Sequence, residues 1–159
     1  MIEDDGSRSD QVDLGSLRSP ILFEIIEDTG QFLTVELIET TGLGALERID
    51  ELIGDARPIR PQAGDRTVRL IWNYVAYFIV AESFYLFKPG AASSAVVEEV
   101  AGEEDFLSYV RSRTWNSDDH FGRLSHWKIQ SSDHVVHIAA RGAPEFHLVG
   151  VVEGTVGND

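Results

Sequence analysis

Cysteine is absent from this chain of 159 residues, and its absence excludes disulfide bonds, thiolate metal sites and thiol catalysis. Long apolar runs are missing as well. The longest, residues 75–81, is far shorter than the roughly 20 residues that a membrane-spanning helix needs. The first five residues include Glu3, Asp4 and Asp5, which is the wrong charge for the start of a secretion signal. We therefore expect a cytoplasmic protein with no membrane partner.

Positive charge is also scarce. The chain holds 13 Lys and Arg residues against 27 Asp and Glu residues, so its net charge is −14. Such a field repels nucleic acid and favours a basic protein partner. The densest basic group, Arg57, Arg60, Arg66 and Arg69, is sparse, and we expect no nucleic acid to bind.

Composition and length indicate one folded domain. Hydrophobic residues make up 43% of the chain and charged residues 25%, as in ordinary globular proteins. Residues 1–18 contain few large apolar groups and are predicted to be a flexible lead-in. The single domain is expected over residues 19–153, followed by a frayed tail over 154–159.

Hydrophobic periodicity predicts an α+β fold, in which two or three helices pack against a mainly antiparallel β-sheet. Strands are expected at residues 21–26, 32–38, 66–81, 123–130, 135–140 and 146–151. Helices are expected at residues 43–53, 93–101 and 103–114. The strand at 66–81 is apolar on both faces, which is typical of a covered central strand, and its length suggests a bend near Asn73.

All five histidines lie after residue 119. If Ser131 and Ser132 form a two-residue hairpin loop, His126 and His137 become directly opposed neighbours. Imidazole and carboxylate groups suit Zn²⁺ or non-haem iron, so His126, His137 and Glu145 are candidate metal ligands. The alternative is a plain polar sheet surface, because no helical histidine pair is present.

Glu82 is the remaining candidate for chemistry. It follows the most apolar strand, where a carboxylate could have a raised pKa or could accept backbone hydrogen bonds. The catalytic candidates are therefore Glu82, His126 and His137. No G-x-S-x-G nucleophile motif occurs.

Part of the chain resembles a family of small bacterial proteins with no established activity, over about residues 66–149. The matching segments are Tyr74 to Phe84, Phe106-Leu107-Ser108-Tyr109, His126-Trp127-Lys128-Ile129, His134-Val135-Val136-His137-Ile138 and Pro144-Glu145. The pattern departs at Ala81, where those proteins carry Asn. The resemblance marks Glu82, His126 and His134 for testing and implies no reaction.

Two functions remain open from the sequence. The first is a non-catalytic protein-binding module without a cofactor, similar to an immunity protein or antitoxin, directed at a basic partner. Its binding face would be the outward side of the helix at 43–53, with Glu47, Asp50 and Glu51. The second is a small metal-dependent or histidine-assisted enzyme. Nothing in the pattern selects an oligomeric state.

Overall fold

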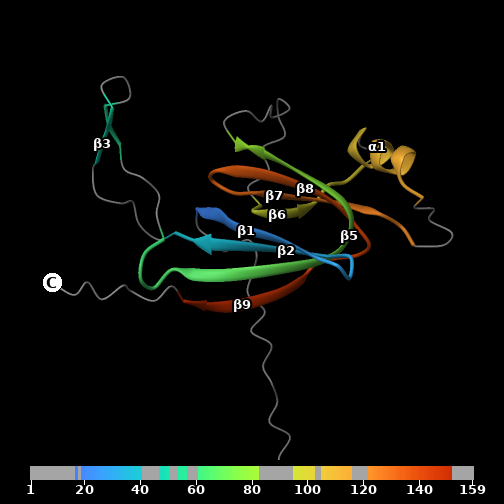
Figure 1. The fold of residues 1–159 in the computed structure, drawn as a ribbon, viewed down its shortest axis with the longest axis horizontal. Coiled ribbons are helices and arrows are strands. Elements are labelled where there is room, and N and C mark those ends of the chain that lie inside the picture. Colours follow the sequence, from blue (N-terminus) through green and yellow to red (C-terminus); the bar gives the residue numbers. More distant parts are fainter. Residues whose placement is uncertain are drawn as a thin grey trace, which may run out of the picture.

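Antiparallel strands make up most of the residues that the structure describes. A computed structural model describes residues 17, 19–40, 47–50, 54–56, 61–82, 95–102, 105–115 and 122–151. The strands are β1 (Pro20–Asp28), β2 (Phe32–Glu39), β3 (Glu47–Asp50), β4 (Gly54–Ala56), β5 (Arg66–Ala81), β6 (Val97–Glu99), β7 (Ser125–Gln130), β8 (His134–Ala140) and β9 (Glu145–Val151), and the helix is α1 (Asp105–Arg113) (Figure 1).

The strand order of the main sheet is β1-β2-β5-β8-β7-β6, with β9 also paired to β5. Strand β5 is shared by two halves of this sheet: one half contains β1, β2 and β9, and the other contains β6, β7 and β8. Its first half pairs with β2 and β9, and its second half pairs with β8. A register shift between Tyr74 and Ala76 interrupts the pairing with β8, and the strand bends in this region, close to the predicted position (Figure 1). The extra residue of a bulge reverses the alternation of side chains. Trp72 and Tyr77 therefore face the same core.

The main core lies between the two halves of the sheet. It draws on β2, the first half of β5, β6, β7 and β8, through Leu33, Val35, Leu37, Val68, Leu70, Trp72, Val97, Ile129, Val136 and Ile138. Trp72 from one half and Trp127 from the other place their ring centroids 6.5 Å apart. Burial of this apolar surface is the chief stabilising contribution.

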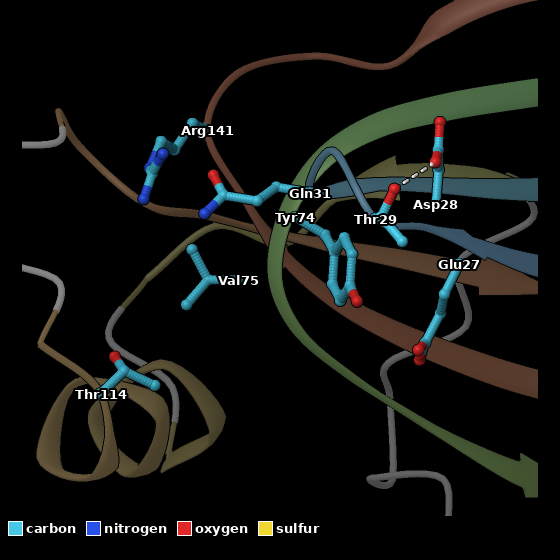
Figure 2. Close-up of a pocket in the computed structure, with 8 residues that line it drawn as sticks. All are labelled: Glu27, Asp28, Thr29, Gln31, Tyr74, Val75, Thr114 and Arg141. Carbon is cyan, nitrogen blue, oxygen red and sulfur yellow. Dashed lines mark hydrogen bonds between the residues drawn. The ribbon is translucent and has the colours of Figure 1, made fainter.

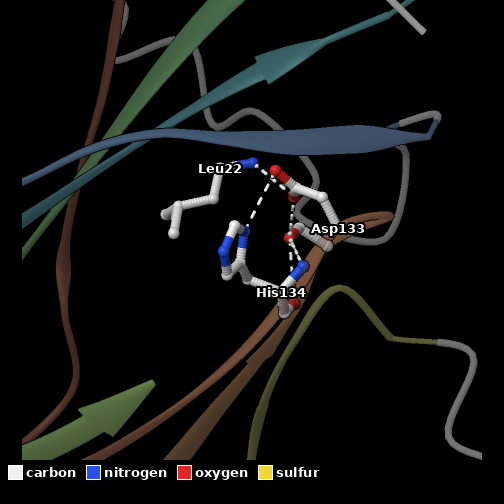
Figure 3. A network of polar contacts seen from close by, with 4 residues as sticks. Leu22, Asp133 and His134 are labelled. Atoms are coloured by element: carbon white, nitrogen blue, oxygen red, sulfur yellow. Dashed lines mark hydrogen bonds and ion pairs between the residues drawn. The ribbon is translucent and has the colours of Figure 1, made fainter. Parts of the chain in front are cut away.

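The turn between β7 and β8 contacts the start of β1, although these strands lie on opposite sides of β5 in the sheet order. The Ser132 amide donates to the Pro20 carbonyl at 2.8 Å. The Leu22 amide donates to the Asp133 carboxylate at 3.0 Å (Figure 3). These two hydrogen bonds therefore connect β1, in one half of the sheet, to the β7–β8 turn in the other half.

Helix α1 covers the other face of the β5–β8–β7 half. Leu107 and Val110, one helical turn apart, are its buried residues, and they pack with Leu124 and Ala139 in a second apolar cluster. Acidic Asp105 in the first turn and basic residues in the last suit the helix dipole. The helix confirms the expectation for residues 103–114. None of the described helical residues forms a segment with the length and apolarity to cross a bilayer.

The α+β prediction is wrong, because α1 is the single helix among the described residues; the predicted antiparallel sheet is confirmed. Within the segment expected to be helical at 43–53, the described residues form β3, which pairs antiparallel with β4 just beyond the segment, with Arg48 opposite Asp55. Within the segment expected to be helical at 93–101, β6 pairs with β7. Short apolar runs fit both helical and strand periods. An isolated helix of about ten residues is only marginally stable. Pairing with a neighbouring strand therefore determined the structure of the described residues in both segments.

Candidate functional site

His126 on β7 and His137 on β8 form a buried hydrogen-bonded pair. Nε2 of His126 lies 2.7 Å from Nδ1 of His137. The side chains are almost fully enclosed, with 1% and 6% of their residue surfaces exposed. Neutral imidazole carries one donor and one acceptor nitrogen, so one ring donates to the other in this contact.

The register of the hairpin differs from the predicted one. His126 lies opposite Ala139, and His137 lies opposite Lys128, so the two histidines are diagonal neighbours. The loop consists of Ser132 and Asp133, because the Ser131 amide donates to the His134 carbonyl at 2.9 Å.

Side-chain hydrogen bonds explain this shift of one residue in the turn. The Ser131 hydroxyl donates to the Asp133 carboxylate at 2.6 Å and accepts the His134 amide at 3.0 Å. Local bonds of this kind from Ser and Asp commonly select a turn. The two imidazoles still meet, because diagonal neighbours on one sheet face are within reach of long side chains.

Aromatic rings surround the histidine pair. Phe78 of β5 stacks on His137 at 4.6 Å with nearly parallel planes. Phe106 of α1 lies 4.9 Å from the ring of His126. Burial, followed by the charges of His126 and Lys128, lowers the pKa of His137 to about 4. His137 is therefore neutral at pH 7.

A small cavity adjoins the histidine pair. It has a volume of about 260 Å³, and its lining includes Glu99, Gly102, Leu107, Arg123 and His126. The His126 carbonyl accepts a hydrogen bond from the Val100 amide at 2.7 Å, which fixes the wall formed by β7. A proton could pass between the two imidazoles beside this cavity.

The other predicted site residues lie elsewhere. Glu82 follows β5, four positions beyond Phe78, and its amide donates to the Asp133 carbonyl at 2.9 Å. Glu145 lies on β9 opposite Ile71, with its carboxylate 3.7 Å from His147. Among the residues that the structure describes, no group of three His, Asp or Glu side chains could hold a metal ion.

The two predicted partner-binding residues that the structure describes lie on a strand and not on a helix. Glu47 and Asp50 are the two ends of β3, and Glu51 lies outside the described residues. His134, which the resemblance singled out, places Nδ1 3.0 Å from the Asp133 carboxylate. It is the first residue of β8, next to the β7–β8 turn, and does not take part in the His126–His137 contact.

A larger pocket opens beside the bend of β5, and sequence reasoning did not find it. Its volume is about 560 Å³, and its lining is Glu27, Asp28, Thr29, Gln31, Tyr74, Val75, Thr114 and Arg141 (Figure 2). These residues come from four separate parts of the chain, so no spacing motif marks them.

Glu27 has two phenolic neighbours in this region. Its hydrogen bond to Tyr77 is the main cause that raises the pKa of that phenol, with burial second. Burial, followed by the charge of Glu27, raises the pKa of Tyr74. Both tyrosines are therefore neutral near Glu27.

The outer side of the β1–β2 hairpin exposes apolar and acidic groups together. A register shift between Leu22 and Glu24 leaves Phe23 without an opposite residue, and Phe23 is 59% exposed. Ile26 is 42% exposed. We call the exposed set the hairpin face, and it consists of Phe23, Glu24, Ile26, Asp28 and Phe32.

Comparison of the chain with protein-family models, curated proteins and solved structures finds no match.

Proposed function

We propose that the protein is a non-catalytic binding module, similar in role to an immunity protein or antitoxin, and that its hairpin face docks on a basic protein. The observation that carries this proposal is the exposure of Phe23, 59%, next to acidic Glu24 on a strand at the sheet edge. Exposed apolar groups that gather on one face mark interaction sites. The carboxylates would steer a cationic partner toward that face.

The position of β1 supports this role. β1 pairs with β2 alone in the described part of the sheet, so most of its outer backbone edge is available for strand addition by a partner. Proteins often protect such edges with bulges and charges. Here the bulge instead turns the large aromatic side chain of Phe23 outward. An exposed aromatic side chain at a sheet edge would favour aggregation and would not protect against it.

Affinity capture with charge-reversed baits tests the proposal. The tagged chain and its Glu24→Lys/Asp28→Lys variant are incubated with lysate, and bound proteins are identified by mass spectrometry at low and high salt. The wild type should retain a basic protein that salt releases, and the variant should lose it. Titration of the purified partner should show affinity lowered by about tenfold or more.

The matched control is the variant Glu99→Lys/Asp105→Lys. It makes the same change in net charge at two exposed positions on β6 and α1, away from the hairpin face. It should retain the partner nearly as well as the wild type. Equal loss in both variants would mean that net charge alone acts, and would contradict a specific docking face.

A histidine-assisted enzyme is the second candidate, and the contact between His126 and His137 favours it. Its weakness is that both rings are almost fully enclosed. A thermal-shift panel of divalent metals on chelator-stripped protein tests for a ligand at the pair, since binding stabilises the folded state. A shift that His126→Gln abolishes would support this candidate, and its absence would leave the pair a structural role.

A further inference from the structure

The pocket beside the bend of β5 has groups of opposite charge at its two sides. Figure 2 shows Arg141 at one side and Glu27 and Asp28 at the other, with Tyr74 between them. Gln31 and Thr29 add neutral polar groups along the same lining. A cluster of carboxylates alone would indicate only solvated acids, whereas this arrangement offers complementary charges across one cavity.

The frame of the pocket is fixed by backbone hydrogen bonds on both sides of the bend. The Tyr74 amide donates to the Gln31 carbonyl at 3.1 Å, and the Arg141 amide donates to the Asn73 carbonyl at 2.9 Å. The first bond holds the β1–β2 turn, and the second holds the connection from β8 to β9. A site formed in advance loses less entropy when a ligand binds.

The walls also suit a compact organic ligand. A volume of about 560 Å³ lies within the range of small-molecule sites. The Tyr74 ring offers a face to an aliphatic chain or to an ammonium group. Glu27 accepts a hydrogen bond from Tyr77, which orients its carboxylate.

We propose that this pocket binds a small zwitterion of amino-acid or short-peptide size. Its ammonium group lies against Glu27, and its carboxylate lies against Arg141, where a guanidinium can bind it through two hydrogen bonds. This proposal does not rest on the hairpin face or on a protein partner.

Binding of defined zwitterions to the purified chain tests the proposal. The probes are glycine, β-alanine, 4-aminobutyrate, 6-aminohexanoate and glycylglycine, which separate the two charges by different lengths. Butyrate and butylamine each retain one charged end. Titrations followed by amide NMR should show millimolar or tighter binding of at least one zwitterion, and binding at least about tenfold weaker for the single-charge probes. The amide signals of Tyr74 and Arg141 should move, and that of Ile129 in the main core should not.

Variants locate the binding to the pocket. Arg141→Gln and Glu27→Gln should each weaken the best probe by about tenfold or more. Gln at position 27 retains an oxygen that can accept from Tyr77, so this variant should fold. Arg123→Gln, at an exposed position outside this pocket, is the control and should bind normally. Absence of binding at about 10 mM, or equal weakening by Arg123→Gln and Arg141→Gln, would overturn the proposal.

Discussion

His126 and His137 lie two positions out of direct register on the β7–β8 hairpin, yet their Nε2 and Nδ1 atoms are 2.7 Å apart. The contact joins two adjacent strands on the sheet face that α1 covers. Because Phe106 and Phe78 pack against the same two rings, the pair is a polar contact within an apolar interface. Its protonation should therefore affect stability directly.

Stability should fall as the pH drops from about 6.5 to 4. The pKa of His137 is about 4 in the folded state and near 6.5 when unfolded. Between these values the unfolded state binds the proton and the folded state does not, so the free energy of unfolding rises with pH. The loss over this window should reach about 3 kcal/mol, measured by urea denaturation at a series of pH values.

His137→Gln is the matched variant for this pH dependence. Glutamine retains hydrogen-bonding groups for His126 and does not titrate. The variant should show a shallower pH slope between 4 and 6.5 than the wild type. An unchanged slope would assign the dependence to other groups.

Removal of Phe106 should expose the histidine pair. Phe106→Ala takes away the ring above His126, so burial of His137 weakens and its pKa should rise from about 4 toward 6.5. The same change should lower the free energy of unfolding by about 2–3 kcal/mol. NMR titration of the imidazole signals measures the first effect. Tyr109→Ala, on the exposed side of α1, should leave the pKa unchanged.

Asp133→Ala should loosen the junction between β1 and the β7–β8 turn. Burial alone would raise the pKa of Asp133, but hydrogen bonds from Leu22, Ser131 and His134 together lower it. The contribution of the carboxylate is therefore present above pH 4 and is lost as the pH falls through its lowered pKa.

The variant should cost about 1–3 kcal/mol of unfolding free energy. It should also speed hydrogen exchange at the Leu22 amide. Ser132→Ala changes an exposed neighbour whose contact with Pro20 is through the backbone, so exchange at Leu22 should be unchanged. Equal exchange rates in all three proteins would contradict the assigned role of the Asp133 carboxylate.

Gly142 and Gly150 should respond differently to alanine. Gly142, between β8 and β9, has φ of 89°, a conformation that strains residues with a Cβ atom. Gly142→Ala should cost about 1 kcal/mol, although nothing lies within 4 Å of the added atom. Gly150 lies in β9 with equally open space, and Gly150→Ala should be neutral or slightly stabilising in thermal unfolding. A similar cost at both positions would show that backbone conformation is not the cause.

Strand patterns in this sequence were more informative than helix patterns. The apolar run of β5 and the turn at Thr29 and Gly30 specify their elements locally, and the structure has both. The segment at 43–53 also shows helical spacing, but the pairing of Arg48 with Asp55 is a contact that no helical period reveals. Valine at 96 and 97 favours a strand as much as a short helix.

The candidate site was predictable only in part, for a similar reason. That two histidines meet on one hairpin follows from their spacing, whereas their register depends on side-chain bonds of Ser131 and Asp133. Their burial depends on α1, whose Phe106 reaches the pair from about 20 residues earlier in the chain. The pocket at Glu27 and Arg141 joins residues more than 100 positions apart, beyond any local pattern.

The sharing of β5 by both halves of the sheet has a consequence for folding during synthesis. The second half of β5 pairs with β8, which begins 53 residues after β5 ends, so ribosomes working at 5–20 residues per second leave it without that partner for roughly 3–10 s. Pairings this distant in sequence slow folding. The nascent chain therefore passes through an interval in which the apolar stretch from Val75 to Ala81 is open to chaperones or to aggregation.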